Sequence, residues 1–229
     1  VSAPHHKNTA DKAVEIVNKA KYAVPADVNN IKASEWIETN SVVYQAILIK
    51  LSSSVAGGTD AIVFLGTTGE PSTMSFEEEV AIMQFAVKQV NGRTKIIFGC
   101  GSNDTATAVM MAKKAEELGG DGLLAVTPYY NKCTQNGLVA YYKAICEAVS
   151  IPVIAYNVPG RTGVEIQPAT MAKIAEIPNI AGIKDAGGNM SKTMETFRLV
   201  REKCDVYSGE DALNLPILAV GGAGVISVL

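Results

Sequence analysis

Histidine is nearly absent from this 229-residue sequence, which contains only the adjacent pair His5 and His6. Neighbouring side chains rarely point in the same direction, no third histidine is present to complete a metal site, and neither histidine is well placed for a Ser-His-Asp triad. We therefore expect no bound metal. Any acid–base chemistry must come from tyrosine, lysine, carboxyl, thiol or hydroxyl side chains.

Three further signals are missing. The four cysteines form no CxxC pair, so we expect reduced thiols, as in a cytosolic protein, and neither a zinc ribbon nor a redox dithiol. No apolar run approaches the ~18–20 residues of a membrane span, and no signal-peptide pattern opens the chain. Lys plus Arg number 20 against 23 Asp plus Glu, a formal net charge of −3. These features predict a soluble, cytoplasmic protein that binds neither nucleic acid nor membranes.

The composition is that of a globular protein, because 48% of the residues are apolar and 19% are charged. The length fits one domain over residues 1–229, and an α/β barrel commonly fills such a length.

From residue 60 onward, short apolar runs without polar alternation predict strands of a parallel sheet that is covered on both faces. The seven runs are Ala61–Leu65, Lys95–Phe98, Gly122–Val126, Pro152–Tyr156, Ala181–Ile183, Asp205–Tyr207 and Gly224–Val228. Helical patterns separate them. Ser75 and Glu78 form a capping box ahead of one helix, and others are expected over 104–118 and 138–149 and from Pro168 onward.

Seven strands at this spacing fit either a (βα)8 barrel with one strand unrecognised or a doubly wound open sheet. Nucleotide motifs argue against the open sheet, because GxxxxGK[ST] is absent and Asp104 follows Gly99-Cys100-Gly101 where a third glycine belongs. We therefore favour an α/β fold of the (βα)8, or TIM, barrel type. The first sixty residues are less regular: 9–21 and 44–55 have helical patterns, and 27–34 is a poor candidate for the missing strand.

Lys184 closes the apolar run 180–183, where a lysine is costly to bury. A desolvated lysine has a lowered pKa and becomes a nucleophilic amine that can form a Schiff base with a ketone. The alternative is a strand-end lysine that extends to water or pairs with Asp185.

Hydroxyl groups at neighbouring strand ends can supply the proton transfers that a Schiff-base lysine requires. Tyr156 ends the strand before that of Lys184, and Thr67 lies at another strand end. For either residue alone, packing in the core with a satisfied hydroxyl is the simpler interpretation, and their convergence with Lys184 favours the relay.

Two segments are candidate anion sites. The GTTG segment at 66–69 lets backbone N–H groups approach a carboxylate, although it also fits a plain turn. Arg161, in a loop rich in Gly and Pro, is suited to a bidentate clamp on a second carboxylate or to a surface salt bridge.

These motifs together resemble the dihydrodipicolinate synthase family, a group of Schiff-base lyases and aldolases that also includes N-acetylneuraminate lyase. The resemblance runs from about residue 57 to residue 229 and rests on an ordered set of segments. The segments are GTTGE at 66–70, GCGSN at 99–103, TPYYNK at 127–132, YNVPGRTG at 156–163, GIKDA at 182–186, YSGEDAL at 207–213 and GGAGVISV at 221–228.

The resemblance implies a (βα)8 barrel, usually tetrameric. It implies an enzyme that condenses pyruvate with L-aspartate 4-semialdehyde to 4-hydroxy-tetrahydrodipicolinate in lysine and diaminopimelate biosynthesis, without a cofactor beyond the covalent imine. By position, Lys184 would form the imine with pyruvate, and Tyr156 would be the main proton donor and acceptor. Thr67 would link Tyr156 to Tyr130, the latter reaching in from a neighbouring subunit.

The same resemblance implies four substrate-binding residues. Thr68 would hold the pyruvate carboxylate, Arg161 would bind the carboxylate of the aldehyde substrate, and Gly209 and Ile226 would shape the pocket. Sialic acid lyases of the family lack this arginine.

The sequence departs from the family's pattern at both ends. Residues 1–43 do not show the expected opening, and the family's C-terminal helical region does not follow Leu229. A helix over 9–21 would then take the place of the last barrel helix, as in a rearranged barrel.

Lysine-inhibited members resemble one another in polar or histidine residues after GTTGE and in a glutamate after GSN. The chain has Phe76, Glu79 and Thr107 in these regions, so we expect weak or absent feedback inhibition.

Two other functions stay open at this stage. One is a related pyruvate aldolase that acts on another aldehyde, and the other is an inactive or pyruvate-binding scaffold.

Overall fold

The computed structural model describes residues 54–227. These residues form two compact units: the smaller contains 54–62 and Ser72–Lys95, and the larger contains Val63–Pro71 and 96–227. The expected helix over 9–21, the candidate strand over 27–34, most of the expected helix over 44–55 and the rearranged 1–43 segment lie outside the described residues.

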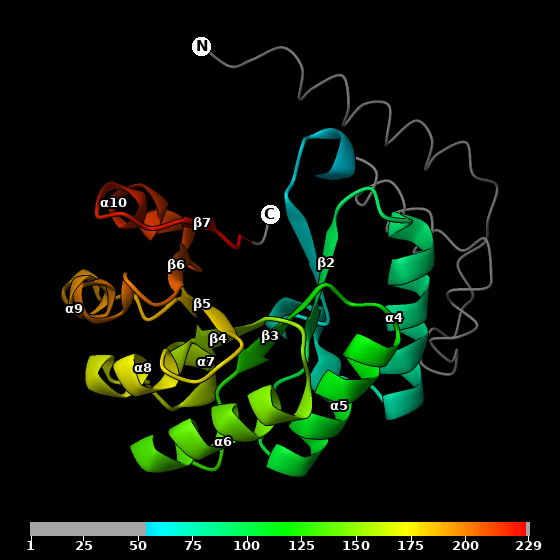
Figure 1. Cartoon of the computed structure of the whole chain (residues 1–229), viewed down its shortest axis with the longest axis horizontal. Helices are drawn as coiled ribbons and strands as arrows, with labels where there is room; N and C mark the ends of the chain where they lie inside the picture. Colours follow the sequence, from blue (N-terminus) through cyan, green and yellow to red (C-terminus); the bar gives the residue numbers. More distant parts are fainter. Residues whose placement is uncertain (1–53, 228–229) are drawn as a thin grey trace, which may run out of the picture. The chain divides into compact units, whose positions relative to one another are not determined.

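The strands form one sheet in the order of the chain, β1-β2-β3-β4-β5-β6-β7 (Figure 1). Every registered pair from β2 to β7 is parallel. The strands are β1 (Ala61–Phe64), β2 (Lys95–Gly99), β3 (Gly122–Val126), β4 (Val153–Asn157), β5 (Ile180–Asp185), β6 (Asp205–Ser208) and β7 (Gly224–Val225). The seven expected strands and the parallel α/β class are therefore confirmed.

Several strand ends differ from the predicted bounds, and strand pairing accounts for two of them. Strand β5 includes Lys184 and Asp185, because their backbones pair with Tyr207 and Ser208 of β6. Strand β7 ends at Val225, since β6 itself ends at Ser208 and offers no further residue to pair with.

Helices of the larger unit lie beside the sheet and pack on one another in chain order, α5 on α6, α6 on α8, α8 on α9 and α9 on α10 (Figure 1). Their bounds are α5 (Thr105–Glu117), α6 (Gln135–Ala148), α7 (Pro159–Thr162), α8 (Pro168–Ile174), α9 (Met190–Val200) and α10 (Asn214–Ala219). Side chains cap three of them, where Asp104, Thr134 and Asn189 each accept a hydrogen bond from a backbone N–H in the first turn.

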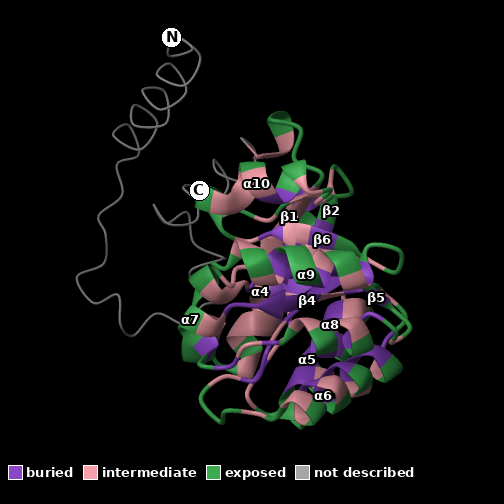
Figure 2. Ribbon diagram, turned by 90° about the vertical axis from the view of Figure 1, so that its left-hand side faces the viewer, coloured by how far each residue is buried: buried purple, intermediate pink, exposed green. Residues whose placement is uncertain are grey.

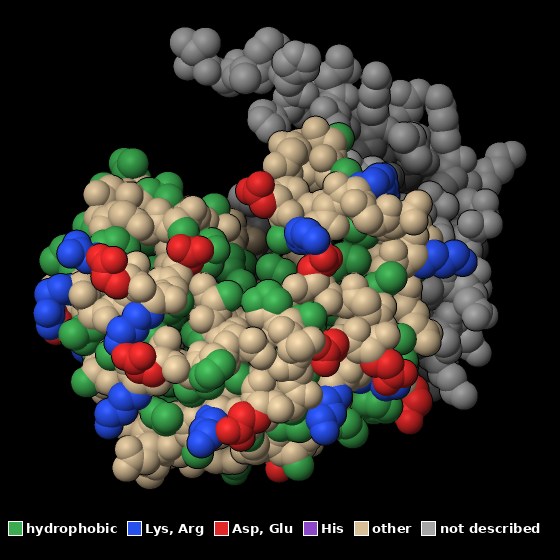
Figure 3. Space-filling model, viewed as in Figure 1, with side chains coloured by type: hydrophobic (Ala, Val, Ile, Leu, Met, Phe, Trp, Pro, Cys, Tyr) green, Lys and Arg blue, Asp and Glu red, His purple; other side chains and the backbone are tan. Residues whose placement is uncertain are grey.

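In the larger unit, the central strands β3, β4 and β5 and the inward faces of the helices are mostly buried, and the outward helix faces are exposed (Figure 2). Acidic and basic side chains alternate over its helices, which agrees with the balanced composition (Figure 3). None of the helices within 54–227 is long and apolar enough to cross a bilayer.

The smaller unit contains α4 (Phe76–Val90) and the first half of β1. The capping box is present as expected: the Ser75 hydroxyl accepts from the Glu78 N–H, and the Glu78 carboxylate accepts from the Ser75 N–H. The backbone N–H groups of Ser75 and Glu78 at this helix start are thereby satisfied.

Close backbone approach in the larger unit depends on Gly99 at the end of β2. A Cβ atom added there would lie 1.9 Å from the Leu65 carbonyl oxygen, and Leu65 itself adopts a left-handed conformation with φ of 56°. A backbone oxygen cannot move aside as a flexible side chain can, so only glycine fits between the first two strand ends of this unit.

We predict that Gly99→Ala destabilises the protein by at least ~2 kcal/mol, because the methyl group displaces backbone at a strand end. The check is the free energy of unfolding in urea. Gly160→Ala is the matched control, since a Cβ at Gly160 meets nothing within 4 Å. Equal stabilities of the two variants would contradict the prediction.

Candidate active site

Parallel register brings four side chains into one row at the carboxyl ends of the central strands. Val126, Tyr156, Lys184 and Tyr207 are successive register partners on β3, β4, β5 and β6. Partners in a parallel ladder present their side chains on the same face of the sheet. Tyr156 and Lys184 are therefore adjacent, as the sequence analysis expects.

The amine of Lys184 is buried beside an aromatic ring. The residue is 5% exposed, and its Nζ lies 4.4 Å from the centroid of the Tyr156 ring. Burial lowers the pKa of the amine from 10.5 to about 8, and the Asp211 carboxylate acts in the opposite direction. A substantial fraction of the amine is thus neutral, and nucleophilic, near neutral pH.

The Tyr156 phenol is 6% exposed and is joined to Thr67 by a side-chain hydrogen bond. Burial raises the pKa of the phenol. The Arg161 guanidinium and the hydrogen bond with Thr67 lower it, and the Glu210 carboxylate raises it. Because the net direction is upward, the phenol keeps its proton at neutral pH and can donate it.

Gly209 makes room for the lysine side chain. A Cβ at this position would lie 2.7 Å from Cε and 3.0 Å from Cγ of Lys184. Ile226 follows β7 and is half-buried, and its N–H donates to the Ser208 carbonyl at 2.8 Å. Gly209 and Ile226 therefore directly follow β6 and β7, the two strands that come after the lysine's strand in the sheet.

Asp185 does not pair with Lys184, so that alternative interpretation is wrong. Successive residues of a strand point to opposite faces, and the Asp185 carboxylate accepts hydrogen bonds from Asn157 and Thr193 instead. The lysine therefore lies beside the Tyr156 ring without its sequence neighbour as counter-ion.

Three of the expected residues lie away from this buried cluster or at its edge. Thr68 is exposed in the single turn Thr67–Gly69, which is closed by the Gly69 N–H donating to the Gly66 carbonyl at 2.7 Å. Arg161 is exposed on α7, near enough to influence Tyr156. Tyr130 is 87% exposed and has a left-handed backbone, with φ of 72°.

The structure thus brings together Lys184, Tyr156, Thr67 and Gly209, places Arg161 near them, and leaves Tyr130 on the surface of its own chain.

Sequence reasoning missed two acidic residues. Glu210 and Asp211 follow β6 directly, and their carboxylates influence Tyr156 and Lys184 respectively. Asp211 is oriented by the Ser227 hydroxyl, which donates to its Oδ1 at 2.6 Å. Their position after the carboxyl end of a strand is the signal that could have identified them.

A metal centre would need several ligands in one place. In the described part of the chain, no group of three or more His, Cys, Asp or Glu side chains has an arrangement that could hold a metal ion.

Comparison with known proteins places this site in a family. The model of the Dihydrodipicolinate synthetase family matches residues 40–229, so the match begins upstream of the resemblance seen in the motifs. The chain is similar to 4-hydroxy-tetrahydrodipicolinate synthase of Caldicellulosiruptor bescii, with 54% identity over 171 residues that make up 75% of this chain and 58% of the relative. It is also similar to the enzyme of the same name from Bacillus velezensis, with 48% identity over 82% of this chain and 65% of the relative.

Solved structures give the same result. Dihydrodipicolinate synthase from Aquifex aeolicus superposes with a TM-score of 0.78 at 46% identity, covering 81% of this chain and 64% of that one. The chloride-inhibited enzyme from Acinetobacter baumannii complexed with pyruvate superposes with a TM-score of 0.75 at 47% identity, covering 79% and 62%. The chain thus spans about three fifths of the length of the relatives it matches. The family match over most of its length and the cluster around Lys184 agree, and the chain belongs to the dihydrodipicolinate synthetase family.

Proposed function

We propose that this protein is a class I, lysine Schiff-base lyase that condenses pyruvate with L-aspartate 4-semialdehyde to 4-hydroxy-tetrahydrodipicolinate, in lysine and diaminopimelate biosynthesis. One observation carries the proposal: a buried amine with a pKa near 8 lies 4.4 Å from the ring of a tyrosine that is hydrogen-bonded to Thr67. The names of the relatives at about 50% identity support the substrate pair.

The first step is imine formation. The neutral Nζ of Lys184 attacks the ketone carbon of pyruvate, the nitrogen gives up one proton, and the carbonyl oxygen takes one up to give a carbinolamine. A second proton, donated by Tyr156, lets this oxygen leave as water. The pKa of Tyr156 is raised by burial, so the phenol holds the proton that this departure requires.

The second step is carbon–carbon bond formation. Loss of a methyl proton converts the imine to an enamine, whose terminal carbon attacks the aldehyde of the second substrate. The resulting alkoxide takes up a proton, and the amino group of the aldehyde substrate then displaces Lys184 as the ring closes. Tyr156 and Thr67 carry the protons, and Tyr130 of a neighbouring subunit connects this relay to solvent.

The carboxylates of the two substrates are bound by two different residues. Thr68 binds the pyruvate carboxylate through its N–H and hydroxyl, and Arg161 binds the carboxylate of the aldehyde substrate. Gly209 and Ile226 shape the pocket around the imine, and the reaction requires no cofactor beyond the covalent imine.

The assembly and the closed fold belong to the same proposal. Tyr130 is 87% exposed, which suits a side chain that serves a neighbouring copy, so we infer a homo-oligomer, either a dimer or a tetramer. We infer that the seven-stranded sheet is part of a single (βα)8 barrel domain over residues 1–229.

The central prediction concerns the lysine. Pyruvate followed by borohydride adds a stable adduct to Lys184, seen by intact mass and peptide mapping, because hydride reduction fixes the imine. Lys184→Arg forms no adduct, since a guanidinium cannot act as the amine. A folded wild-type chain that remains unmodified would favour the inactive scaffold.

The pH dependence follows from the same amine. A lowered pKa means that the neutral form gains population as pH rises through about 8, so the rate of imine formation rises with pH and levels off above that value. The measurement mixes pyruvate with enzyme for timed intervals at each pH and quenches with excess borohydride. A rate that keeps rising tenfold per pH unit to pH 10 would indicate an ordinary, solvated lysine.

Substitution of Arg161 tests whether L-aspartate 4-semialdehyde is the second substrate. Arg161→Ala is expected to leave pyruvate trapping intact and to lower kcat/KM for L-aspartate 4-semialdehyde roughly 10- to 100-fold, through loss of a charge-assisted hydrogen-bond pair. Arg161→Lys is the matched control, because it keeps the charge without the bidentate geometry. Unchanged kinetics with this aldehyde would favour an aldolase for another one.

A further inference from the structure

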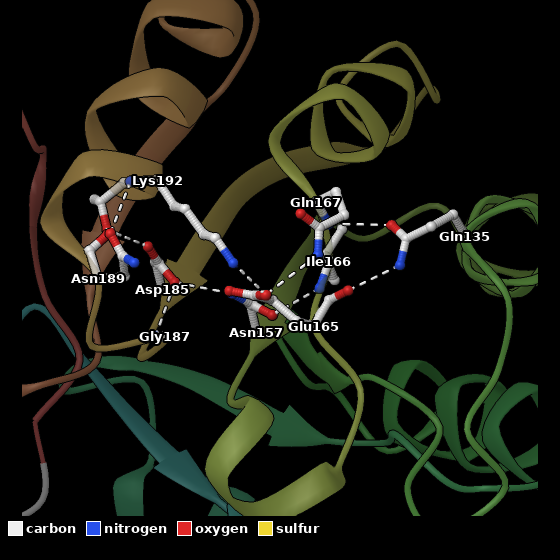
Figure 4. Close-up of polar contacts among 10 residues, drawn as sticks. Gln135, Asn157, Glu165, Ile166, Gln167, Asp185, Gly187, Asn189 and Lys192 are labelled. Carbon is white, nitrogen blue, oxygen red and sulfur yellow. Dashed lines mark hydrogen bonds and ion pairs between the residues drawn. The ribbon is translucent and has the colours of Figure 1, made fainter.

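A second polar row lies directly behind the active-site row. Asn157 follows Tyr156 on β4, Asp185 follows Lys184 on β5, and the two are register partners. Because side chains alternate along a strand, this pair points away from the reactive side chains, and both members are buried. The close-up shows them turned toward each other between the two strand ends (Figure 4).

The Asp185 carboxylate is held by three neutral donors. Its Oδ1 accepts from Asn157 Nδ2 and from the Gly187 N–H, both at 3.0 Å (Figure 4). Its Oδ2 accepts from the Thr193 hydroxyl at 2.6 Å. Thr193 lies on α9 and is itself buried, so this last bond joins a helix to the strand that carries Lys184.

Asn157 is oriented from its other side. Its Oδ1 accepts from the Ile166 N–H at 3.0 Å, which leaves the amide nitrogen to face Asp185 (Figure 4). The backbone continues the linkage: Ala186 N–H donates to the Asn157 carbonyl at 2.9 Å, and Gly209 N–H donates to the Asp185 carbonyl at 2.8 Å. The network therefore ends at the glycine that faces Lys184.

A buried carboxylate is a costly way to join a helix to a strand, because an apolar pair of similar size would stabilise the fold at least as well. The hydrogen bonds of the Asp185 carboxylate are directional, however, and they hold the ends of two strands in one geometry. The ends concerned are those that carry Tyr156 and Lys184, one residue away in each case.

We propose that Thr193 is a positioning residue for imine formation, acting through Asp185 and Asn157 to hold the Lys184 amine against the Tyr156 ring. This inference rests on the proposed function. Thr193 does not touch the reacting groups. It aligns them by completing the hydrogen bonds of the carboxylate between the two strands.

A nearby threonine provides a matched control. Thr127 directly follows Val126, the last residue of β3, and it is fully buried. Within residues 54–227 its Oγ1 has no hydrogen-bond partner. Thr127→Val and Thr193→Val thus make the same isosteric change at two buried sites, and only the second removes a bond to Asp185.

The experiment compares Thr193→Val, Thr193→Ser and Thr127→Val in the full chain. At saturating pyruvate, Thr193→Val is expected to form the reducible adduct roughly 10- to 100-fold more slowly, with the pyruvate concentration for half-maximal rate unchanged. Thr193→Ser, which keeps the hydroxyl, restores the rate, and Thr127→Val behaves as wild type. Wild-type adduct formation by Thr193→Val would overturn the proposal.

A second measurement needs no pyruvate. Lys184 is acetylated with acetic anhydride at a series of pH values, and the extent of labelling is measured by peptide mass. The labelling reports directly how much of the amine is neutral, and half-maximal labelling of the wild type is expected near pH 8. Thr193→Val is expected to move this midpoint upward, toward that of a solvated lysine. An unchanged midpoint in Thr193→Val would overturn the proposal about Thr193, even if the wild type bound no pyruvate. Absence of a pyruvate adduct in the wild type would count against the proposed function alone. If Thr193→Val does not fold, Asp185→Asn is measured in its place with the same expectations.

Discussion

The parallel register between β4 and β5 is the constraint on which the rest of the site depends. It makes Tyr156 and Lys184 partners, and it makes the next residues of the two strands, Asn157 and Asp185, partners as well. Because side chains alternate, one pair serves the reactive face and the other faces the helices. A shift of one residue in this pairing would turn one strand over relative to the other, so that either Asp185 would become the partner of Tyr156 or Asn157 the partner of Lys184.

Burial acts on the two reactive groups in complementary directions. It lowers the pKa of the lysine and raises the pKa of the tyrosine, since in each case it disfavours the charged form. Near neutral pH the site can therefore offer a neutral amine and a protonated phenol at the same time, which are the two species that carbinolamine formation and dehydration require. Arg161 on α7 and the two acidic residues that follow β6, Glu210 and Asp211, adjust this balance.

Small residues determine how closely the backbone and the reactive side chains approach each other. Gly209 admits the lysine side chain, and Gly99 admits the Leu65 carbonyl. Both lie at or just beyond the carboxyl end of a strand, the edge at which barrel enzymes assemble their catalytic groups. The larger unit thus combines a parallel ladder with close packing at two glycines near the carboxyl ends of its strands.

Local pattern alone determined much of this protein. The seven apolar runs are the seven strands, the Ser75 and Glu78 capping box begins α4, and Pro168 begins α8, because strand burial, capping and proline geometry act over a few neighbouring residues. Only the tertiary structure decided that Asp185 joins Asn157 and Thr193 rather than Lys184, that Glu210 and Asp211 influence the site, and that β7 ends at Val225. Each of these outcomes depends on which residues of distant segments become register partners and on how deeply they are buried, and neither quantity is a property of the local sequence.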